Sequence, residues 1–280
     1  MKSFIPWLAA LLLCSFPAHS QDTLVLPHAD AILYTGTNAS QPLVVGLGGS
    51  EGGNAWASRR WKQTRDRFLE KGYAFLAVGY FKTKNSPPLL EKIALEDVYS
   101  AITAARKNAK VNGSKIAVIG GSRGADLALL LAAHYGNISC VIGLSPSHAV
   151  FPGNTDHLST SSWTFQNKEL SFVPVNEAAL PFILNGNLRA AFSTMLLDSL
   201  AEQRARIPVE NIKGNILLIS GTNDEICPST SMCNKMVEKL SSVPFPYYYE
   251  HLATKGGHAQ PLQHFEMVFT FLEKYFSSQP

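Results

Sequence analysis

The sequence predicts an α/β fold with a mostly parallel central sheet and helices on both faces of that sheet. Short apolar segments bounded by glycine, proline or asparagine alternate along the chain with amphipathic helical segments. This alternation is typical of successive βα units, whose strands form a parallel sheet. A second observation is a Gly-x-Ser-x-Gly pentapeptide at 120–124, which lies between a strand-like apolar run (116–119) and a helix-forming run (125–133).

The individual elements follow from these patterns. The predicted parallel strands are short apolar runs at 43–47, 73–79, 115–120, 140–144, 216–221 and 247–251. The predicted helices are amphipathic stretches at 56–71, 95–109, 124–135, 229–240 and 260–276. A weaker pair of runs, at 23–26 and 31–34, is expected to add antiparallel edge strands at the start.

One interval breaks the alternation. Between Leu144 and Ile216 the chain shows no clear strand, although 187–206 reads as helical. A long insertion after a sheet strand usually forms a lid or a functional loop, so a lid is expected at about 148–212. Its aromatic residues Trp163 and Phe165 are expected to shape an acyl pocket. A structural excursion without a role in binding is the alternative.

Ser122, at the centre of the pentapeptide, is the predicted nucleophile. Between a buried strand and a helix, the Gly-x-Ser-x-Gly turn is so tight that the serine takes strained backbone angles. Its flanking glycines leave the Oγ uncovered. The helix that follows offers free N–H groups and the positive end of its dipole to an oxyanion. The pattern therefore predicts acyl transfer through Ser122.

A serine hydroxyl needs a base, and His258 is the best-placed histidine. It follows the last predicted strand in Lys-Gly-Gly-His, where two glycines let the loop bring the imidazole back over the sheet edge. His134, His148 and His157 come too early for the chain order nucleophile, acid, histidine. His251 and His264 fall at a strand end and inside a helix, where structural roles are expected.

The acid of such a triad should follow the strand at 216–221. Asp224 lies at the loop position from which a short carboxylate can reach the histidine Nδ1 and fix its tautomer. The neighbouring Glu225 is the alternative. Together, Ser122, Asp224 and His258 occur in the expected order.

An oxyanion hole requires two backbone donors. The first is expected to be the amide of Arg123, directly after the nucleophile. The second is expected from the glycine-rich loop at 48–53, whose backbone can approach a substrate carbonyl closely. Gly49 or Ser50 is the expected donor, and Glu51 of the same loop is expected to lie beside the substrate. A phosphate-binding loop is a poor alternative because the Gly-Lys-Ser/Thr ending is absent.

The N-terminus has the pattern of a secretory signal. Lys2 precedes an apolar stretch at 7–16 and an Ala-His-Ser cleavage site, with cleavage expected before Gln21. The predicted domains are therefore a signal peptide at 1–20 and a single α/β domain at 21–280. A lipoprotein anchored through Cys14 is the less favoured alternative, because a bulky leucine precedes that cysteine. Export to the periplasm or the medium is expected, without a stable membrane anchor.

Composition excludes several function classes. The 24 Lys and Arg residues nearly balance the 21 Asp and Glu residues, and no long basic run is present, so no nucleic-acid partner is expected. No His/Cys/Asp cluster shows ligand spacing, so neither a metal nor an organic cofactor is expected. Cys140 lies in a strand-like run and is expected to be an inert core thiol. Cys227 and Cys233 either form a disulfide, as an exported protein permits, or remain free thiols.

The chain resembles the C-terminal catalytic domain of the acyl-CoA thioesterase and bile acid-CoA:amino acid N-acyltransferase family. The resemblance spans nearly the whole predicted mature chain, and its most specific motifs are the glycine-Glu loop and a Ser-Ser-Trp-Thr patch. The motifs that carry it lie at 48–53, 80–81, 93–96, 119–126, 161–165 and 207–212. The resemblance implies an α/β-hydrolase fold and Ser122, Asp224 and His258 as the triad. Within this family a serine nucleophile implies hydrolysis, whereas a cysteine favours transfer to an amine.

Two expected features of this chain depart from the family pattern. Typical members carry an N-terminal β-sandwich domain before this region, whereas a signal peptide and a single α/β domain are predicted here. Typical members also act inside cells on coenzyme A thioesters, whereas this chain is expected to be exported. The expected function is a serine hydrolase that cleaves an acyl thioester or ester substrate through an acyl-Ser122 intermediate. A secreted carboxylesterase or peptidase with the same triad is the first alternative, and a non-catalytic binding module on the same fold is the second.

Overall fold

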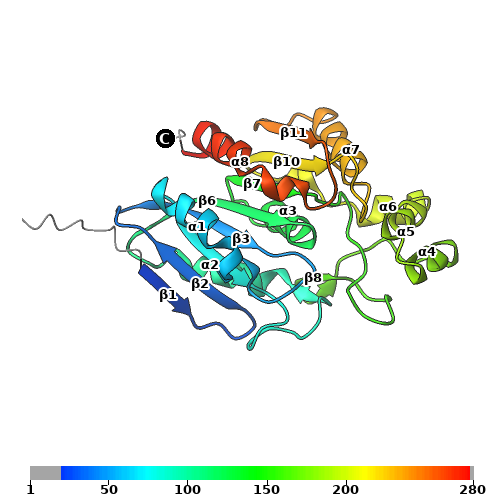
Figure 1. The fold of residues 1–280 in the computed structure, drawn as a ribbon, viewed down its shortest axis with the longest axis horizontal. Coiled ribbons are helices and arrows are strands. Elements are labelled where there is room, and N and C mark those ends of the chain that lie inside the picture. Colours follow the sequence, from blue (N-terminus) through cyan, green and yellow to red (C-terminus); the bar gives the residue numbers. More distant parts are fainter. Residues whose placement is uncertain (1–19, 278–280) are drawn as a thin grey trace, which may run out of the picture.

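A computed structural model describes residues 20–277 and contains an eight-stranded sheet in the order β1-β2-β4-β3-β6-β7-β10-β11 (Figure 1). β1 and β2 pair antiparallel, β2 pairs antiparallel with β4, and every following pair is parallel. The strands are β1 (Ser20–Leu24), β2 (Asp30–Thr35), β3 (Gln41–Leu47), β4 (Ala74–Gly79), β6 (Val111–Gly121), β7 (Cys140–Leu144), β10 (Asn215–Gly221) and β11 (Tyr249–Thr254). The predicted α/β fold, including the antiparallel strand pair at its start, is confirmed.

Helices cover both faces of the sheet because strand side chains alternate between two cores. Leu43, Val45 and Leu47 of β3 belong to one core, and Val44 between them belongs to the other. The helices of the first core are α2 (Leu95–Ala105), α3 (Arg123–His134) and α7 (Ser229–Ser241). Those of the second core are α1 (Lys62–Glu70) and α8 (Phe265–Leu272), which contribute a cluster of packed phenylalanines.

Several element boundaries differ from the predicted ones. The predicted helix at 56–71 consists of two short 3-10 turns, Ala55–Ala57 and Arg59–Trp61, followed by α1. The predicted helix at 260–276 opens with a 3-10 turn, Gln260–Gln263, and continues as α8. β11 begins two residues later and ends three residues later than predicted, since it follows β10 in parallel register up to Thr254.

The segment between β7 and β10 (residues 145–214, hereafter the β7–β10 segment) includes the predicted lid. It contains the short helices α4 (Leu180–Leu184), α5 (Leu188–Met195) and α6 (Ser199–Ala205). It also contains β8 (Trp163–Phe165) and β9 (Lys168–Glu169), which form a small second sheet with β5 (Ile93–Ala94). A third apolar cluster holds this segment against the body of the protein through Phe151, Met195 and Met232.

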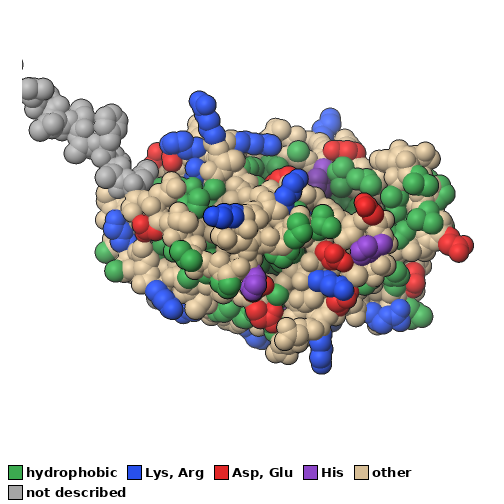
Figure 2. All heavy atoms as spheres, turned by 90° about the horizontal axis from the view of Figure 1, so that it is seen from below, with side chains coloured by type: hydrophobic (Ala, Val, Ile, Leu, Met, Phe, Trp, Pro, Cys, Tyr) green, Lys and Arg blue, Asp and Glu red, His purple; other side chains and the backbone are tan. Residues whose placement is uncertain are grey.

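Figure 2 shows acidic and basic side chains interspersed with apolar ones on the face that it presents, with apolar side chains gathered at the end where α4 to α6 lie. Leu184, Leu197 and Leu200 of this end are largely exposed. Within residues 20–277, no helix combines the length and the hydropathy needed to cross a bilayer. Most of the predicted signal peptide, residues 1–19, lies outside the described residues.

Candidate active site

Ser122 lies on the turn between β6 and α3 and has φ 53° and ψ −124°, a backbone conformation that side chains other than glycine rarely adopt. Its two flanking glycines are required by close packing. A Cβ added at Gly120 would lie 1.9 Å from the carbonyl oxygen of Gly124. A Cβ added at Gly124 would lie 2.2 Å from the carbonyl oxygen of Gly48. The turn therefore has the geometry of a nucleophile elbow.

The elbow is held at the carboxyl edge of the sheet. The amide of Ser122 donates to the carbonyl of Leu144 at the end of β7 (2.8 Å), and its own carbonyl accepts from the amides of Ala125 (2.8 Å) and Asp126 (3.2 Å). α3 begins at Arg123, and the first amides of a helix have no partner within the helix. The Arg123 amide is thus available beside the serine.

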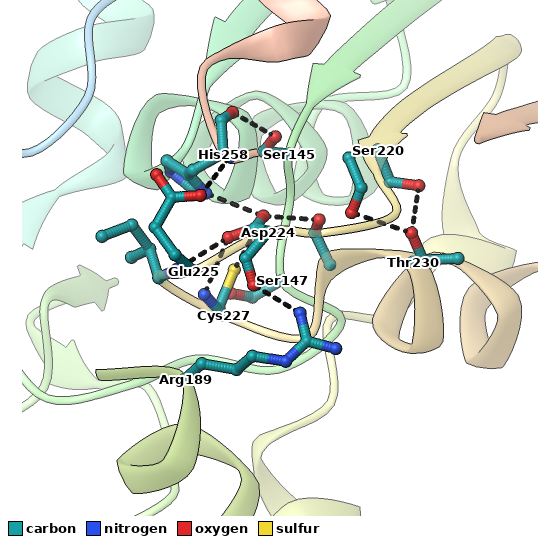
Figure 3. Close-up of polar contacts among 12 residues, drawn as sticks. Ser145, Ser147, Arg189, Ser220, Asp224, Glu225, Cys227, Thr230 and His258 are labelled. Carbon is teal, nitrogen blue, oxygen red and sulfur yellow. Dashed lines mark hydrogen bonds and ion pairs between the residues drawn. The ribbon is translucent and has the colours of Figure 1, made fainter. Parts of the chain in front are cut away.

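Asp224 and His258 lie in the loops after β10 and β11 and are joined by a hydrogen bond (Figure 3). The His258 Nδ1 and the Asp224 Oδ2 are 2.8 Å apart. Asp224 is fully buried, whereas 17% of the His258 side chain is exposed. Because Nδ1 faces the carboxylate, the imidazole presents Nε2 to the cavity side, which is the arrangement of a base oriented by a buried acid.

Asp224 is held as a carboxylate by its neighbours. Burial raises its pKa, but hydrogen bonds from His258, from the Ser229 hydroxyl (2.6 Å) and from the Cys227 amide (3.0 Å) outweigh burial. The resulting pKa lies below the ordinary value of an aspartate. An ionised acid at this position accepts a hydrogen bond from the His258 Nδ1 and so fixes the tautomer of the imidazole.

The His258 loop is fixed by contacts on its backbone. The Glu225 carboxylate accepts from the His258 amide (2.9 Å), and the Ser145 hydroxyl donates to the His258 carbonyl (2.8 Å). Glu225, the alternative acid, therefore binds the backbone of the histidine and not its ring. A Cβ on Gly221 would lie 2.3 Å from the Gly257 carbonyl oxygen, so a glycine at the end of β10 lets the two loops approach.

Ser122 and His258 both line one cavity of about 510 Å³. Its walls come from the glycine-rich loop, the nucleophile elbow, the loop that carries Asp224, the loop that carries His258, and the β7–β10 segment. The apolar wall residues of the β7–β10 segment are Phe151, Val175, Ile183, Leu188, Phe192 and Met195. The cavity therefore combines an apolar wall with a reactive edge, as expected of a small-molecule site.

The glycine-rich loop lies directly against the elbow. A Cβ on Gly49 would lie 3.1 Å from the Gly121 carbonyl oxygen and 3.3 Å from the Ser122 Cβ. The Tyr80 hydroxyl fixes the loop by donating to the Gly48 carbonyl (2.6 Å). Gly49, Ser50 and Glu51 all line the cavity. The geometry leaves both Gly49 and Ser50 as candidates for the second oxyanion donor.

Trp163 and Phe165 do not line the cavity, contrary to the sequence-based expectation. Trp163 is fully buried in the first core, where its ring packs against Tyr80 at a centroid distance of 5.9 Å. The Phe165 ring packs against the ring of His134, the last residue of α3, with the ring centroids 4.1 Å apart. Both residues lie in β8, whose pairing with β5 holds them on the body of the protein. The aromatic residues that line the cavity are Trp56, Trp61, Phe151 and Phe192, and the ring centroids of the two phenylalanines are 4.6 Å apart.

Cys227 and Cys233 are free and buried, so the alternative without a disulfide describes the structure. Asp224, Cys227 and His258 present ligand atoms within 4.8 Å of one another, which is close enough for a metal ion. Burial, followed by the nearby Asp224, raises the pKa of the Cys227 thiol well above its ordinary value, which disfavours a thiolate ligand. The Asp224–His258 hydrogen bond already accounts for the closeness of the other two residues, so we assign the group to acid–base chemistry.

Sequence reasoning missed the residues that support the site. Ser145 follows the strand end at Leu144 and has a positive φ of 51°. The Ser229 hydroxyl donates to the Asp224 carboxylate. Arg189 of α5 donates to the backbone carbonyl of Asp224 (Figure 3). A serine one residue past a buried strand was a usable signal for Ser145. No local pattern marks Arg189, because its partner lies 35 positions away.

Three other histidines, His251, His148 and His264, have structural partners. The His251 ring in β11 is bonded to Ser220 (2.8 Å) and to Asn234 (3.0 Å), and His148 is buried against Glu202 (2.9 Å). His264 precedes α8 and contacts Gln260 (3.1 Å).

A family model described as "BAAT / Acyl-CoA thioester hydrolase C terminal" matches residues 93–269, more than half of the chain. The chain is 25% identical over 171 residues to acyl-coenzyme A amino acid N-acyltransferase 1 of Mus musculus, an alignment that covers 60% of this chain and 38% of that protein. It is 27% identical over 161 residues to the peroxisomal succinyl-coenzyme A thioesterase of Mus musculus, covering 55% and 34%. The chain thus spans well under half the length of these relatives.

Solved structures with the same fold include esterases. An esterase of Pyrococcus furiosus superposes with a TM-score of 0.63 at 17% identity, covering 93% of this chain and 94% of that chain. Acetyl xylan esterase 1 of Thermoanaerobacterium superposes with a TM-score of 0.58 at 13% identity, covering 94% and 89%. At these identities the superpositions show the fold, which is that of the α/β hydrolases. The chain therefore belongs to the BAAT and acyl-CoA thioester hydrolase family and has the α/β-hydrolase fold.

Proposed function

We propose that this protein is a serine hydrolase that cleaves acyl thioesters or esters through a covalent acyl-Ser122 intermediate. The observation that carries the proposal is the convergence of Ser122 and His258 on one cavity, with His258 bonded through Nδ1 to the buried Asp224 at 2.8 Å. These residues come from three separate strand ends, and their arrangement supports nucleophilic catalysis.

In acylation, His258 Nε2 takes the proton of the Ser122 hydroxyl while Oγ attacks the acyl carbonyl carbon. The carbonyl oxygen becomes an oxyanion, which is stabilised by the Arg123 amide and by an amide of Gly49 or Ser50. Asp224 stabilises the imidazolium that forms. The tetrahedral intermediate then collapses, and His258 returns the proton to the departing thiol or alcohol.

In deacylation, water attacks the acyl-Ser122 ester and His258 takes one of its protons. The oxyanion forms in the same hole, and its collapse releases the carboxylic acid and returns the proton to Ser122. We propose water as the acceptor because the nucleophile is a serine; the N-acyltransferase relatives make transfer to an amine the outcome to test against it.

The test is a panel of acyl-CoA thioesters, p-nitrophenyl esters and aminoacyl substrates, run with and without an added amino acid as acceptor. We expect hydrolysis of thioesters or esters, and a loss of about a thousandfold or more in kcat for Ser122→Ala. Ser242→Ala is the matched control, because that hydroxyl contacts only the carbonyl of Lys239 on an exposed helix end.

Four results would change the assignment. If kcat/KM for simple esters exceeds that for thioesters by more than about tenfold, the thioesterase assignment would be replaced by a carboxylesterase. A ratio of this size is larger than the loss of a single contact explains. Formation of an N-acyl amino acid as the main product would replace hydrolysis by acyl transfer. Equal rates for wild type and Ser122→Ala would remove Ser122 as the nucleophile, and no turnover of any substrate in the panel would leave a binding module as the better account.

A further inference from the structure

The glycine-rich loop carries one charged side chain, Glu51, on the wall of the cavity that contains Ser122. Glu51 is exposed, so a molecule in the cavity can reach its side chain. Arg123 and Asp126 also line the cavity, but both are buried and form an ion pair with each other at 3.8 Å. Within the described part of the chain, Glu51 therefore supplies the accessible carboxylate of the cavity wall.

The Glu51 carboxylate lies beside the backbone that faces Ser122. A Cβ built on Gly49 would lie 2.9 Å from the Glu51 Oε2 and 3.3 Å from the Ser122 Cβ. A Cβ built on Gly48 would lie 3.4 Å from the Glu51 Oε1. A single methyl group at Gly49 would thus touch both the carboxylate and the nucleophilic residue, and Gly49 is a candidate oxyanion donor.

The loop that carries Glu51 is anchored on both sides of it. On one side the Tyr80 hydroxyl donates to the Gly48 carbonyl (2.6 Å), and on the other the Gly53 amide donates to the Phe81 carbonyl (3.0 Å). Burial, and after it the negative charge of Glu51, raises the pKa of the Tyr80 phenol, which agrees with a carboxylate close to the first anchor. The fold therefore sets the position of the Glu51 carboxylate.

The protein supplies no direct counter-charge for Glu51. Among residues 20–277, no hydrogen bond or ion pair joins its carboxylate to another residue. Arg123 and His258, the basic residues of the cavity wall, are paired with carboxylates of their own. A negative charge at this place opposes the oxyanion that forms when Ser122 attacks a carbonyl, because like charges repel strongly where water is excluded. A cationic substrate removes this repulsion and gains a charge-assisted hydrogen bond.

The position of the carboxylate indicates where the substrate carries its positive charge. In the proposed function the carbonyl oxygen lies at the Arg123 amide and at an amide of Gly49 or Ser50. A substrate group that contacts Glu51 beside Gly49 must therefore lie close to the carbonyl carbon. An ammonium group on the α carbon, the carbon next to the carbonyl, meets this condition. The apolar wall of the β7–β10 segment can then receive the side chain of the same α carbon.

We propose that Glu51 binds the α-ammonium group of the acyl part of the substrate, so that the preferred substrates are esters or thioesters of α-amino acids with an apolar side chain. This inference rests on the proposed function, because Glu51 selects among acyl groups delivered to Ser122. Hydrolysis releases the free amino acid, and the bonds broken and the proton transfers remain those of the acyl-Ser122 route. Glu51 contacts the ammonium group and takes no proton from it.

The experiment compares N-acetylcysteamine thioesters of L-leucine and L-phenylalanine with those of 4-methylpentanoic and 3-phenylpropanoic acid, which lack only the amino group. The assays are run at about pH 6.5, where the α-amino group is protonated. An α-ammonium group also activates its carbonyl toward any nucleophile, so the quantity measured is the change in the kcat/KM ratio between wild type and Glu51→Gln. We expect the ratio of amino to desamino substrate to fall by about tenfold or more in Glu51→Gln. The kcat for the desamino substrates should stay the same or rise, because a negative charge near the oxyanion is removed.

Glu70→Gln is the matched control, because Glu70 is an exposed residue at the end of α1, and it should keep the wild-type ratio. An unchanged ratio in Glu51→Gln, whether or not both rates fall, would overturn the subsite. A preference that follows a cationic alcohol, as in choline esters, would also overturn it by placing the charge in the leaving group. Glu51-dependent formation of an N-acyl product from an added amine would overturn it by assigning the carboxylate to an acceptor.

A second measurement separates this inference from the proposed function. Calorimetric titration of Ser122→Ala with L-leucinamide and with 4-methylpentanamide, which lacks the amino group, reports binding without turnover. Tighter binding of L-leucinamide, lost when Glu51→Gln is added, supports the subsite even if no substrate is hydrolysed. Equal, weaker or absent binding of L-leucinamide would overturn the subsite, while leaving hydrolysis through Ser122 in place.

Discussion

Ser122 keeps its strained backbone because the residues around it leave no room for another conformation. The Leu144 carbonyl holds its amide, and the turn passes so close to Gly124 and Gly48 that only hydrogen fits at two positions. Strain of this kind costs on the order of 1–3 kcal/mol and persists where the surrounding structure enforces it. The spacing of the glycines could be predicted from the sequence because this steric demand is local.

Gly120→Ala is expected to destabilise the protein. Its Cβ would lie 1.9 Å from the Gly124 carbonyl oxygen, so β6 and α3 must move apart. We expect the free energy of unfolding to fall by about 1–3 kcal/mol, as for overpacked cores, with a loss of activity as the serine shifts. Urea denaturation measures this. Gly136→Ala is the control, since its Cβ would find its nearest atom, in the flexible Lys213 side chain, at 3.6 Å. Equal stability of the two variants would contradict the packing account.

Asp126→Asn is expected to change how stability depends on pH. The folded-state pKa of Asp126 is raised to about 7, whereas in the unfolded chain an aspartate titrates near 4. Between about pH 4 and pH 7 the folded protein therefore binds more protons at this site, and its stability falls as pH rises. Asparagine does not titrate and keeps an oxygen for the Ser147 amide.

The free energy of unfolding of Asp126→Asn, minus that of wild type, should therefore increase from about pH 4 to about pH 8. Urea denaturation at several pH values within this window measures the difference. The same substitution at the exposed Asp156 shows what the loss of one charge does by itself. A difference that stays constant across the window would mean that Asp126 titrates alike in the folded and unfolded states, and it would contradict the raised pKa.

At the scale of elements, the sheet could be predicted. In the β7–β10 segment the helical stretch expected at 187–206 is confirmed by α5 and α6, but the short strands could not be predicted. Buried parallel strands such as β7 are continuous apolar runs, which a single sequence reveals. The three-residue β8 and the two-residue β9 are too short for a periodic pattern to reveal them. β8 pairs with the equally short β5, which lies far away along the chain. For the same reason the position of Trp163 could not be foreseen: its environment depends on Ile93, 70 residues earlier.

Arg189→Met tests whether α5 supports the acid loop. The Arg189 guanidinium donates to the Asp224 carbonyl and so joins this helix to the loop that carries the acid. Loss of this hydrogen bond should lower kcat by about twofold to tenfold and speed amide hydrogen exchange at residues 222–227. Arg204→Met in α6 is the control. Unchanged exchange in Arg189→Met would show that other contacts, such as those of Ser229 and the Cys227 amide with Asp224, hold the loop without Arg189.

At the scale of the whole molecule, the sheet order gathers the site. The carboxyl ends of β3, β6, β10 and β11 meet at one edge, so the loops that follow them bring the glycine-rich loop, Ser122, Asp224 and His258 together. The rule that ligands bind at the carboxyl ends of parallel strands made this placement predictable. The Arg123–Asp126 pair was not predictable, because its burial depends on Pro152 and Ser147 of a segment without sequence periodicity.

Export is the remaining proposal at this scale. If residues 1–20 act as a signal peptide, expression of the full chain in a bacterial host should yield exported protein that begins at Gln21. Intact-mass measurement of the periplasmic fraction identifies the N-terminus. Protein that retains Met1 in the cytoplasm would refute cleavage, and a lipid-modified Cys14 would favour the anchored alternative.

The central claim is that Ser122 is the nucleophile activated by His258 and Asp224. Its most direct test is labelling of the native protein with a fluorophosphonate, followed by intact-mass measurement and peptide mapping. We expect a single adduct on the peptide that contains Ser122, no adduct in Ser122→Ala, and labelling slowed by about a hundredfold or more in His258→Ala. An adduct on another serine, or equal labelling of wild type and Ser122→Ala, would contradict the account.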